Sequence, residues 1–211
     1  MVSGAAPRTN PRNRAVYLYR RLAPAYDLLL GPVFPRPRRR ALDLLAVQPG
    51  GDVVLVGVGT GLDLPLLPVG VRAVGLDLSG SMLARAQARL PMPGRQIDLV
   101  EADAVTWLRG HPGAFDAAVL TLVLSVVPDG TACLHAAVAA LRPGGRLVVF
   151  DKFAPASGVS RARRIVNVVA SRVGTDITRA WEPMLAGSGA DVVREEPALR
   201  GLYRVVLLRR R

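Results

Sequence analysis

The hydrophobic pattern of the chain changes near residue 50. Beyond it, short apolar runs rich in valine, leucine and alanine alternate with stretches of helical periodicity. Such alternation is typical of a parallel β-sheet that helices cover on both faces. We expect strands at 53–56, 73–76, 97–100, 117–122 and 146–150. Helices are expected between them at 62–67, 79–90, 105–109 and 131–141.

The order of elements changes after Lys152. Two helices and then two more strands are expected, at 159–172, 176–185, 190–194 and 203–208. The segment between these strands contains Pro197 and Gly201 and is too short for a crossover helix, so the strands should pair antiparallel. The sequence therefore predicts an α/β fold: a Rossmann-like three-layer sandwich whose seven-stranded, mostly parallel sheet ends in a C-terminal antiparallel hairpin.

The N-terminal region has a different pattern. Residues 1–12 are polar and contain two prolines, so we expect a flexible basic arm. From there on, apolar side chains recur at helical spacing, and a basic run at 36–40 leads into a helix expected at 41–47. Residues 13–47 are therefore predicted to form a helical lid on a single domain that spans 13–211.

The formal net charge of +12 is concentrated near the N-terminus. Residues 1–40 contain nine arginines and a single acid, Asp27. Such clustering indicates an anionic partner. Nucleic acid, phospholipid headgroups and an acidic substrate are all compatible with the charge alone.

Cysteine and histidine are scarce. The only cysteine, Cys133, excludes an intramolecular disulfide and a multi-cysteine metal site. His111 lies in a loop and His135 in an expected helix, so both are interpreted as structural and no metal is expected. The longest apolar runs fall short of the ~18–20 residues that a membrane span needs, and no secretory h-region follows the N-terminus. We therefore expect a cytoplasmic location.

Three closely spaced glycines follow the first expected strand. The segment runs Gly57-Val58-Gly59-Thr60-Gly61. Without Cβ atoms, such a loop lets a ligand press against the backbone, although a tight turn without a ligand would have the same pattern. A dinucleotide-binding fingerprint needs its third glycine one position later, where the chain has Leu62, so the pattern disfavours NAD.

Acidic residues follow the second and third strands. Asp77 lies twenty residues after Gly57, where a carboxylate can accept hydrogen bonds from both ribose hydroxyls. Asp103 could accept a hydrogen bond from an adenine amine while the backbone amide of Ala104 meets the ring. Each acid could instead cap the helix that follows, although Ser79 suits the cap after Asp77 better. Because the loop and both acids follow neighbouring strands, they favour a bound nucleoside.

Residues 53–153 resemble the class I S-adenosylmethionine-dependent methyltransferases. The likeness rests on the glycine loop, on Asp77 and on the segment Leu-Arg-Pro-Gly-Gly-Arg at 141–146. Further similarity points to the branch that contains phosphatidylethanolamine N-methyltransferases and ubiquinone or menaquinone C-methyltransferases. It is carried by the segments 22–27, 31–34, 57–65 and 150–153.

The resemblance implies S-adenosylmethionine as the cofactor and S-adenosylhomocysteine as its product. Besides the glycine loop, the cofactor is expected to contact residues at the strand ends, namely Asp77, Leu78, Met82, Asp103, Ala104 and Thr121. Family members usually carry an acid two residues before the first glycine that holds the methionine amine, but this chain has Leu55 there. The carbonyls of Gly57 and Thr121 could replace it. A cofactor-binding relative with altered or lost catalysis stays an alternative.

The acceptor is expected above the end of the fourth strand. The stretch 121–128 is markedly apolar, which favours a small, lipid-like acceptor such as a phospholipid amine or a quinone ring; a soluble metabolite is the alternative. In the family the N-terminal helix folds over this opening, so Tyr26, Tyr19 and Tyr17 are candidates for positioning. In-line methyl transfer can gain about 7–11 kcal/mol from positioning alone, so no other catalytic group is required.

Two further expectations concern partners. An apolar lid helix flanked by arginines suits peripheral contact with an anionic membrane at its inner face. A nucleic-acid substrate is disfavoured, because the fourth strand ends without an Asp/Asn-Pro-Pro-aromatic motif or a neighbouring catalytic cysteine. The sequence carries no prediction of oligomeric state.

Overall fold

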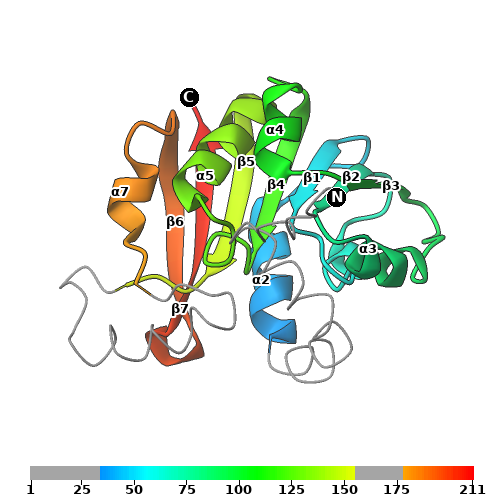
Figure 1. The fold of residues 1–211 in the computed structure, drawn as a ribbon, viewed down its shortest axis with the longest axis horizontal. Coiled ribbons are helices and arrows are strands. Elements are labelled where there is room, and N and C mark those ends of the chain that lie inside the picture. Colours follow the sequence, from blue (N-terminus) through cyan, green and yellow to red (C-terminus); the bar gives the residue numbers. More distant parts are fainter. Residues whose placement is uncertain (1–33, 155–177) are drawn as a thin grey trace, which may run out of the picture.

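One β-sheet forms the centre of the described part of the chain (Figure 1). The structure is a computed structural model and describes residues 34–154 and 178–211. Within those residues the sheet has seven strands in the order β3-β2-β1-β4-β5-β7-β6. They are β1 (Asp52–Val56), β2 (Arg72–Asp77), β3 (Gln96–Glu101), β4 (Phe115–Thr121), β5 (Leu141–Asp151), β6 (Ala190–Ala198) and β7 (Tyr203–Arg210).

The sheet has a parallel part and an antiparallel part. β1 pairs in parallel with β2 and β4, β2 with β3, and β4 with β5. β7 runs antiparallel to both β5 and β6. The predicted α/β fold, with a mostly parallel sheet and a C-terminal antiparallel hairpin, is confirmed. Because the parallel strands all end at one edge, the residues that follow them gather there.

Helices cover both faces of the sheet. The described helices are α2 (Pro35–Leu45), α3 (Gly80–Gln87), α4 (Ala104–Arg109), α5 (Gly130–Ala140) and α7 (Trp181–Leu185), with 3-10 turns η1 (Leu64–Leu66) and η2 (Leu199–Gly201). One buried cluster packs α4, α5 and α7 on the sheet, and a second packs α2, η1 and α3 on the other face. Val119 and Leu120 of β4 belong to different clusters, as the alternation of a strand requires. These are the predicted three layers.

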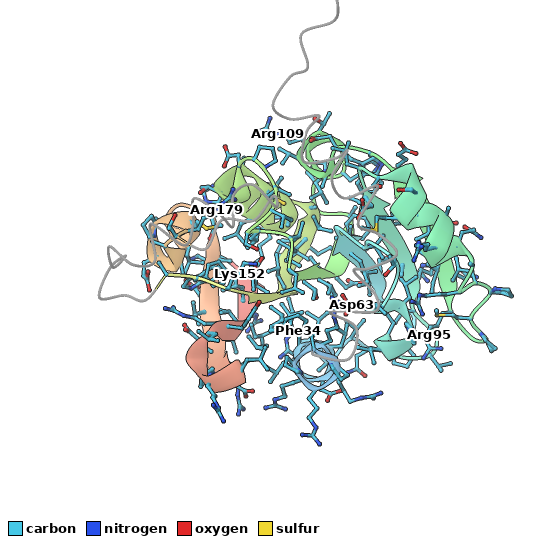
Figure 2. The ribbon with its side chains drawn as sticks, turned by 60° about the horizontal axis from the view of Figure 1, so that its bottom comes forward. Phe34, Asp63, Arg95, Arg109, Lys152 and Arg179 are labelled. Atoms are coloured by element: carbon cyan, nitrogen blue, oxygen red, sulfur yellow. The ribbon has the colours of Figure 1, made fainter. Side chains whose placement is uncertain are left out.

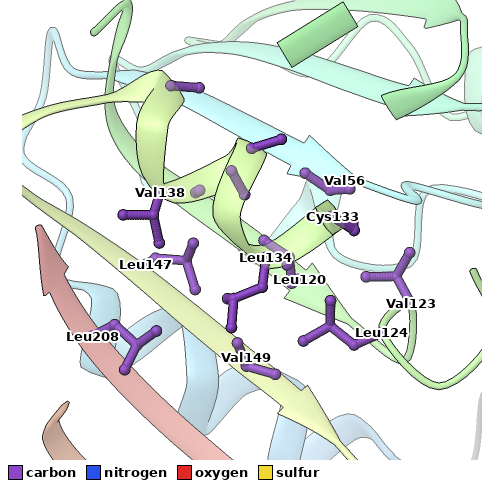
Figure 3. Packing of buried hydrophobic residues seen from close by; sticks show 14 of the residues in the cluster. Val56, Leu120, Val123, Leu124, Cys133, Leu134, Val138, Leu147, Val149 and Leu208 are labelled. Atoms are coloured by element: carbon purple, nitrogen blue, oxygen red, sulfur yellow. The ribbon is translucent and has the colours of Figure 1, made fainter. Parts of the chain in front are cut away.

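Figure 3 shows the first of these clusters. Leu134 of α5 packs with Leu120, Leu147 and Val149 of β4 and β5, and all four side chains are fully buried. Burial of one such side chain stabilises the fold by about 1.5–3 kcal/mol. This apolar packing holds β4 and β5 in place against α5.

The helix expected at 62–67 is wrong. The chain forms only the 3-10 turn η1 there, in which the amide of Leu66 donates to the carbonyl of Asp63 at 3.0 Å. Pro65 lacks an amide hydrogen and cannot extend the turn into an α-helix.

The helix expected at 41–47 is also wrong in its bounds. It begins earlier, at Pro35, whose fixed φ suits the first turn of a helix. It ends at Leu45, because Ala46 adopts a left-handed conformation with a φ of 49°. The basic run at 36–40 is therefore part of the helix.

Other boundaries differ by less. α3 ends at Gln87 rather than at residue 90, α7 begins at Trp181, and β5 starts earlier than expected, at Leu141. The predicted arm, the lid up to residue 33 and the helix expected at 159–172 lie outside the described residues. So do the positioning candidates Tyr17, Tyr19 and Tyr26.

A buried ion pair joins α2 to the edge where the strands end. Nη1 of Arg38 lies 2.8 Å from Oδ1 of Asp63, and the two side chains are 8% and 7% exposed. Asp63 follows the glycine loop, so the pair connects this loop with α2. Arg40, on the same helix, instead pairs with Glu196 at the surface.

Replacing Arg38 with methionine should lower the free energy of unfolding by about 3–5 kcal/mol, because the buried carboxylate of Asp63 would lose its partner. Arg40→Met removes an identical cation from the same helix, but its exposed pair with Glu196 should matter far less. Denaturant unfolding followed by circular dichroism measures both variants. Equal losses of stability would contradict the assignment of Arg38 as the anchor of α2.

Candidate functional site

The glycine loop, residues 57–61, lies at the edge where the parallel strands end. Figure 2 looks toward this edge, with Asp63 near its centre. Gly57 has a φ of 67°, and a Cβ atom on it would lie 2.6 Å from Cγ2 of Val123. Gly59 also has a positive φ, 56°, but a Cβ there would meet only a carbonyl oxygen at 3.9 Å. Packing inside the protein therefore requires Gly57, whereas the space beside Gly59 is open to a ligand.

The other residues of the loop are held from within the protein. Val58 is buried and donates its amide to the carbonyl of Leu76 at the end of β2, at 2.8 Å. The amide of Gly61 donates to the carbonyl of Val58 at 3.0 Å. Thr60 is buried, and its carbonyl accepts a hydrogen bond from Nε of Arg89 at 2.7 Å. These contacts fix the loop before any ligand binds.

Asp77, at the end of β2, holds the glycine loop through its carboxylate. Its Oδ2 accepts the amide of Gly59 at 2.8 Å, and its Oδ1 accepts the amide of Ser79 at 2.9 Å. Burial raises the pKa of the Asp77 carboxyl, and the two amides oppose that effect. Ser79 occupies the N-cap position of α3, as expected, but its hydroxyl pairs with that of Ser81 at 3.0 Å and makes no capping hydrogen bond.

The residues expected around the adenine lie on neighbouring elements. Leu78 follows Asp77 and is 52% exposed, whereas Met82 is buried in α3. Asp103 precedes Ala104 and accepts the amide of Thr106 at 2.9 Å, so it does cap α4. The capping alternative for Asp103 is thus confirmed, and its contact with adenine stays a prediction.

Thr121 ends β4 beside the glycine loop. Its hydroxyl oxygen is buried and has no hydrogen-bond partner among the described residues. Leu122 follows with a φ of 57°, a strained value for a leucine, and donates its amide to the carbonyl of Phe150 at 2.7 Å. Leu55, at the position where an acid is usual, is 1% exposed and packs in the second buried cluster.

A buried carboxylate that the sequence did not single out holds the segment after β4. We call residues 122–128 the acceptor loop. Asp151, at the end of β5, is fully buried, and its Oδ2 accepts the amide of Ser125 at 3.0 Å. Burial raises the pKa of this carboxyl as well. The contact fixes the middle of the acceptor loop to the end of β5.

Arg179 holds the same loop from the other side. Its guanidinium donates to the carbonyls of Leu124 at 2.5 Å and of Val127 at 2.6 Å. Its own carbonyl accepts the amide of Ala154, just after β5, at 2.8 Å. No local pattern reveals this residue, because its partners lie more than fifty positions earlier in the chain.

The histidines and the cysteine serve the fold, as predicted. His111 stacks on Trp107 with ring centroids 3.7 Å apart, and Nε2 of His135 lies 3.1 Å from the carbonyl of Met184. Cys133 is buried in the core, which raises the pKa of its thiol to about 12. Within 34–154 and 178–211, no group of three or more metal-ligating side chains is arranged around a common point.

The sequence is similar to those of known methyltransferases. A family model described as a methyltransferase domain matches residues 54–149. A phosphatidylethanolamine N-methyltransferase of Cereibacter sphaeroides is 32% identical over 202 residues, which cover 92% of this chain and 96% of that protein. A demethylmenaquinone methyltransferase of Thermus thermophilus is 34% identical over 150 residues, or 67% of each protein.

Solved structures share the fold. The 1,6-didemethyltoxoflavin-N1-methyltransferase of Burkholderia thailandensis, crystallised with S-adenosylhomocysteine, has a TM-score of 0.66 at 21% identity and covers 98% of this chain and 93% of its own. Fold, sequence and the glycine loop thus agree on one family. The chain belongs to the class I S-adenosylmethionine-dependent methyltransferases, in the branch of the phosphatidylethanolamine N-methyltransferases and the quinone methyltransferases.

Proposed function

We propose that this methyltransferase modifies a small, lipid-like acceptor, either a phospholipid amine or a quinone ring. The acceptor loop carries this proposal, since it contains no charged residue and its half-buried side chains Leu122, Val126 and Val127 are apolar. The names of the two relatives support it, because one modifies phosphatidylethanolamine and the other demethylmenaquinone. Asp151 and Arg179 hold the loop rigidly enough to orient such an acceptor.

The rim of the sheet fits S-adenosylmethionine, which supplies an electrophilic methyl group on its sulfonium. In our proposal the backbone at Gly59 faces the cofactor, and the carboxylate of Asp77 accepts hydrogen bonds from the ribose hydroxyls. The exposed side chain of Leu78 covers the adenine, with the buried Met82 beneath it. Asp103 and the amide of Ala104 meet the polar edge of the adenine. The unpartnered hydroxyl of Thr121 is available to the methionine end.

The acceptor supplies the reacting electron pair. Its lone pair or carbanion forms a bond to the methyl carbon while the carbon–sulfur bond breaks, and that electron pair stays on sulfur. The acceptor gives up one proton to solvent. The protein must hold the acceptor atom in line with the methyl carbon and the sulfur. Val123 favours this arrangement because it packs the acceptor loop directly on Gly57.

We also propose peripheral contact with an anionic membrane, at the inner face of which a lipid acceptor would be reached. Arg36 and Arg39 are exposed on α2, near the end of this helix that lies at the site. Each basic residue near an anionic surface contributes about 1 kcal/mol to binding. In the described ranges, no helix combines the length and the apolar character that crossing a bilayer demands.

A second candidate is a relative that binds the cofactor but has altered or lost catalysis. Leu55 favours it, because an acid that usually holds the methionine amine is replaced by a core side chain. A soluble metabolite as acceptor is the third candidate, and the same assay separates all three.

Alanine substitutions should separate the two roles of the glycines. Both Gly57→Ala and Gly59→Ala carry about 1–2 kcal/mol of backbone strain, but only the first places a methyl group against Val123. Gly57→Ala should therefore have the lower melting temperature without ligand. Gly59→Ala should mainly lose affinity for S-adenosylhomocysteine in calorimetry. A Gly59 variant that binds like wild type would remove the loop from the cofactor site.

Affinity for S-adenosylhomocysteine should depend on pH through Asp77. Burial raises the pKa of this carboxyl above its ordinary 3.8, so the carboxyl becomes protonated as the pH falls through that raised value. The ribose hydroxyls favour the ionised form, and affinity should weaken over the same interval. Asp77→Asn should bind about 10- to 100-fold more weakly and lose this dependence. Asp98→Asn, on exposed β3, is the matched control, and an unchanged profile in Asp77→Asn would reject the ribose contact.

Transfer of a labelled methyl group tests the acceptor. The protein is incubated with methyl-labelled S-adenosylmethionine and, separately, with phosphatidylethanolamine, demethylmenaquinol and a pool of soluble metabolites. We expect label in one of the two lipids. Label only in a soluble compound would refute the lipid-like acceptor. Tight binding of S-adenosylhomocysteine without transfer to any acceptor would favour the relative with lost catalysis.

A further inference from the structure

Lys152 is the only lysine of the chain and lies beside the acceptor loop. It follows β5 directly, and Figure 2 places it near the centre of the rim. In the pairing of β4 with β5, Thr121 stands opposite Phe150, so Lys152 comes two positions beyond the end of β4. The preceding residue, Asp151, binds the amide of Ser125 in the acceptor loop. The backbone of Lys152 therefore borders the space where the acceptor is proposed to lie.

The ammonium group of Lys152 has no hydrogen bond or ion pair with any residue of the described ranges. Asp151, its nearest carboxylate in sequence, uses Oδ2 for the amide of Ser125 and Oδ1 for the backbone amide of Lys152 itself. Other cations near this edge are paired: Arg38 with Asp63, and Arg179 with backbone carbonyls. Lys152 thus differs from these arginines, because its charged group has no partner among the described residues.

This unpaired cation is also partly desolvated. The Lys152 side chain is half-buried, and burial lowers the pKa of its amine while the charge of Asp151 opposes that effect. A cation without a partner is unfavourable in such a place, and an anion on a bound ligand would relieve the penalty. Lys152 therefore has the properties expected of a group that completes its contacts only when an acceptor is bound.

We propose that Lys152 binds an anionic group of the acceptor and is the residue that selects a phospholipid amine over a quinone ring. The proposal rests on the proposed function and narrows it. The amine of phosphatidylethanolamine is two carbons away from a phosphodiester, whereas a quinone ring has no formal negative charge.

Three variants test this role. Lys152→Met keeps the length of the side chain without its charge, Lys152→Arg keeps the charge, and Arg109→Met removes an exposed cation at the far end of α4. Methyl transfer is measured with short-chain phosphatidylethanolamine in neutral micelles and with demethylmenaquinol. Lys152→Met should raise KM for the phospholipid about 10- to 100-fold, as expected for one charged hydrogen bond, and change kcat far less. Lys152→Arg should recover most of the loss, and Arg109→Met should match wild type.

A binding experiment separates failure of this proposal from failure of the proposed function. Glycerophosphoethanolamine is titrated into wild type and Lys152→Met, each saturated with S-adenosylhomocysteine. Binding to wild type that is lost in Lys152→Met supports the role of Lys152 even if no lipid is methylated. Unchanged kinetics and unchanged probe binding in Lys152→Met would overturn the proposal. So would a wild-type protein that neither binds the probe nor transfers methyl to the phospholipid. An equal loss of affinity for S-adenosylhomocysteine in Lys152→Met would also overturn it, because it would assign Lys152 to the cofactor.

Discussion

The carboxylate of Asp77 is the contact on which the site depends. It accepts the amides of Gly59 and Ser79 and so ties the glycine loop after β1 to the end of β2. A buried carboxylate is expensive to desolvate, and two amide donors offset much of that cost. Because these donors already fix its orientation, the carboxylate would not need to reorganise to meet the ribose that we propose it binds.

From that anchor a continuous series of contacts reaches the acceptor side. Gly57 lies against Val123, so the glycine loop and the acceptor loop pack directly on each other. The acceptor loop is in turn held by Asp151 and Arg179. A reaction that depends mainly on alignment needs such connection, since a misplacement of about 1 Å can cost on the order of 100-fold in rate. The proposed cofactor and acceptor subsites therefore rest on one connected set of contacts.

Local sequence patterns predicted the strands and the glycine loop but not the ion pairs and hydrogen bonds between residues far apart in the chain. The strands and the mostly parallel sheet could be predicted because short apolar runs alternate with helices, and the glycine loop and Asp77 follow those strands. The ion pair of Arg38 with Asp63 could not, because arginine in a basic run looks solvent-exposed and its partner lies 25 residues away. Arg179 was missed for the same reason. The helix expected at 62–67 failed where a single proline outweighed the apolar spacing.

Leu55 shows how the two halves of the cofactor site differ. An acid at this fully buried position would need strong partners, and leucine removes that requirement while adding to the core. In the proposed site, the carbonyls of Gly57 and Thr121 could hold the methionine amine instead, together with the buried hydroxyl of Thr121, which has no partner among the described residues. In the proposed site, the nucleoside end thus meets the preorganised carboxylate of Asp77, and the methionine end meets neutral dipoles. We therefore expect the adenosine half of S-adenosylmethionine to contribute most of its binding free energy. The position of the sulfonium would then depend on the rigidity of β1, β4 and the loops that follow them.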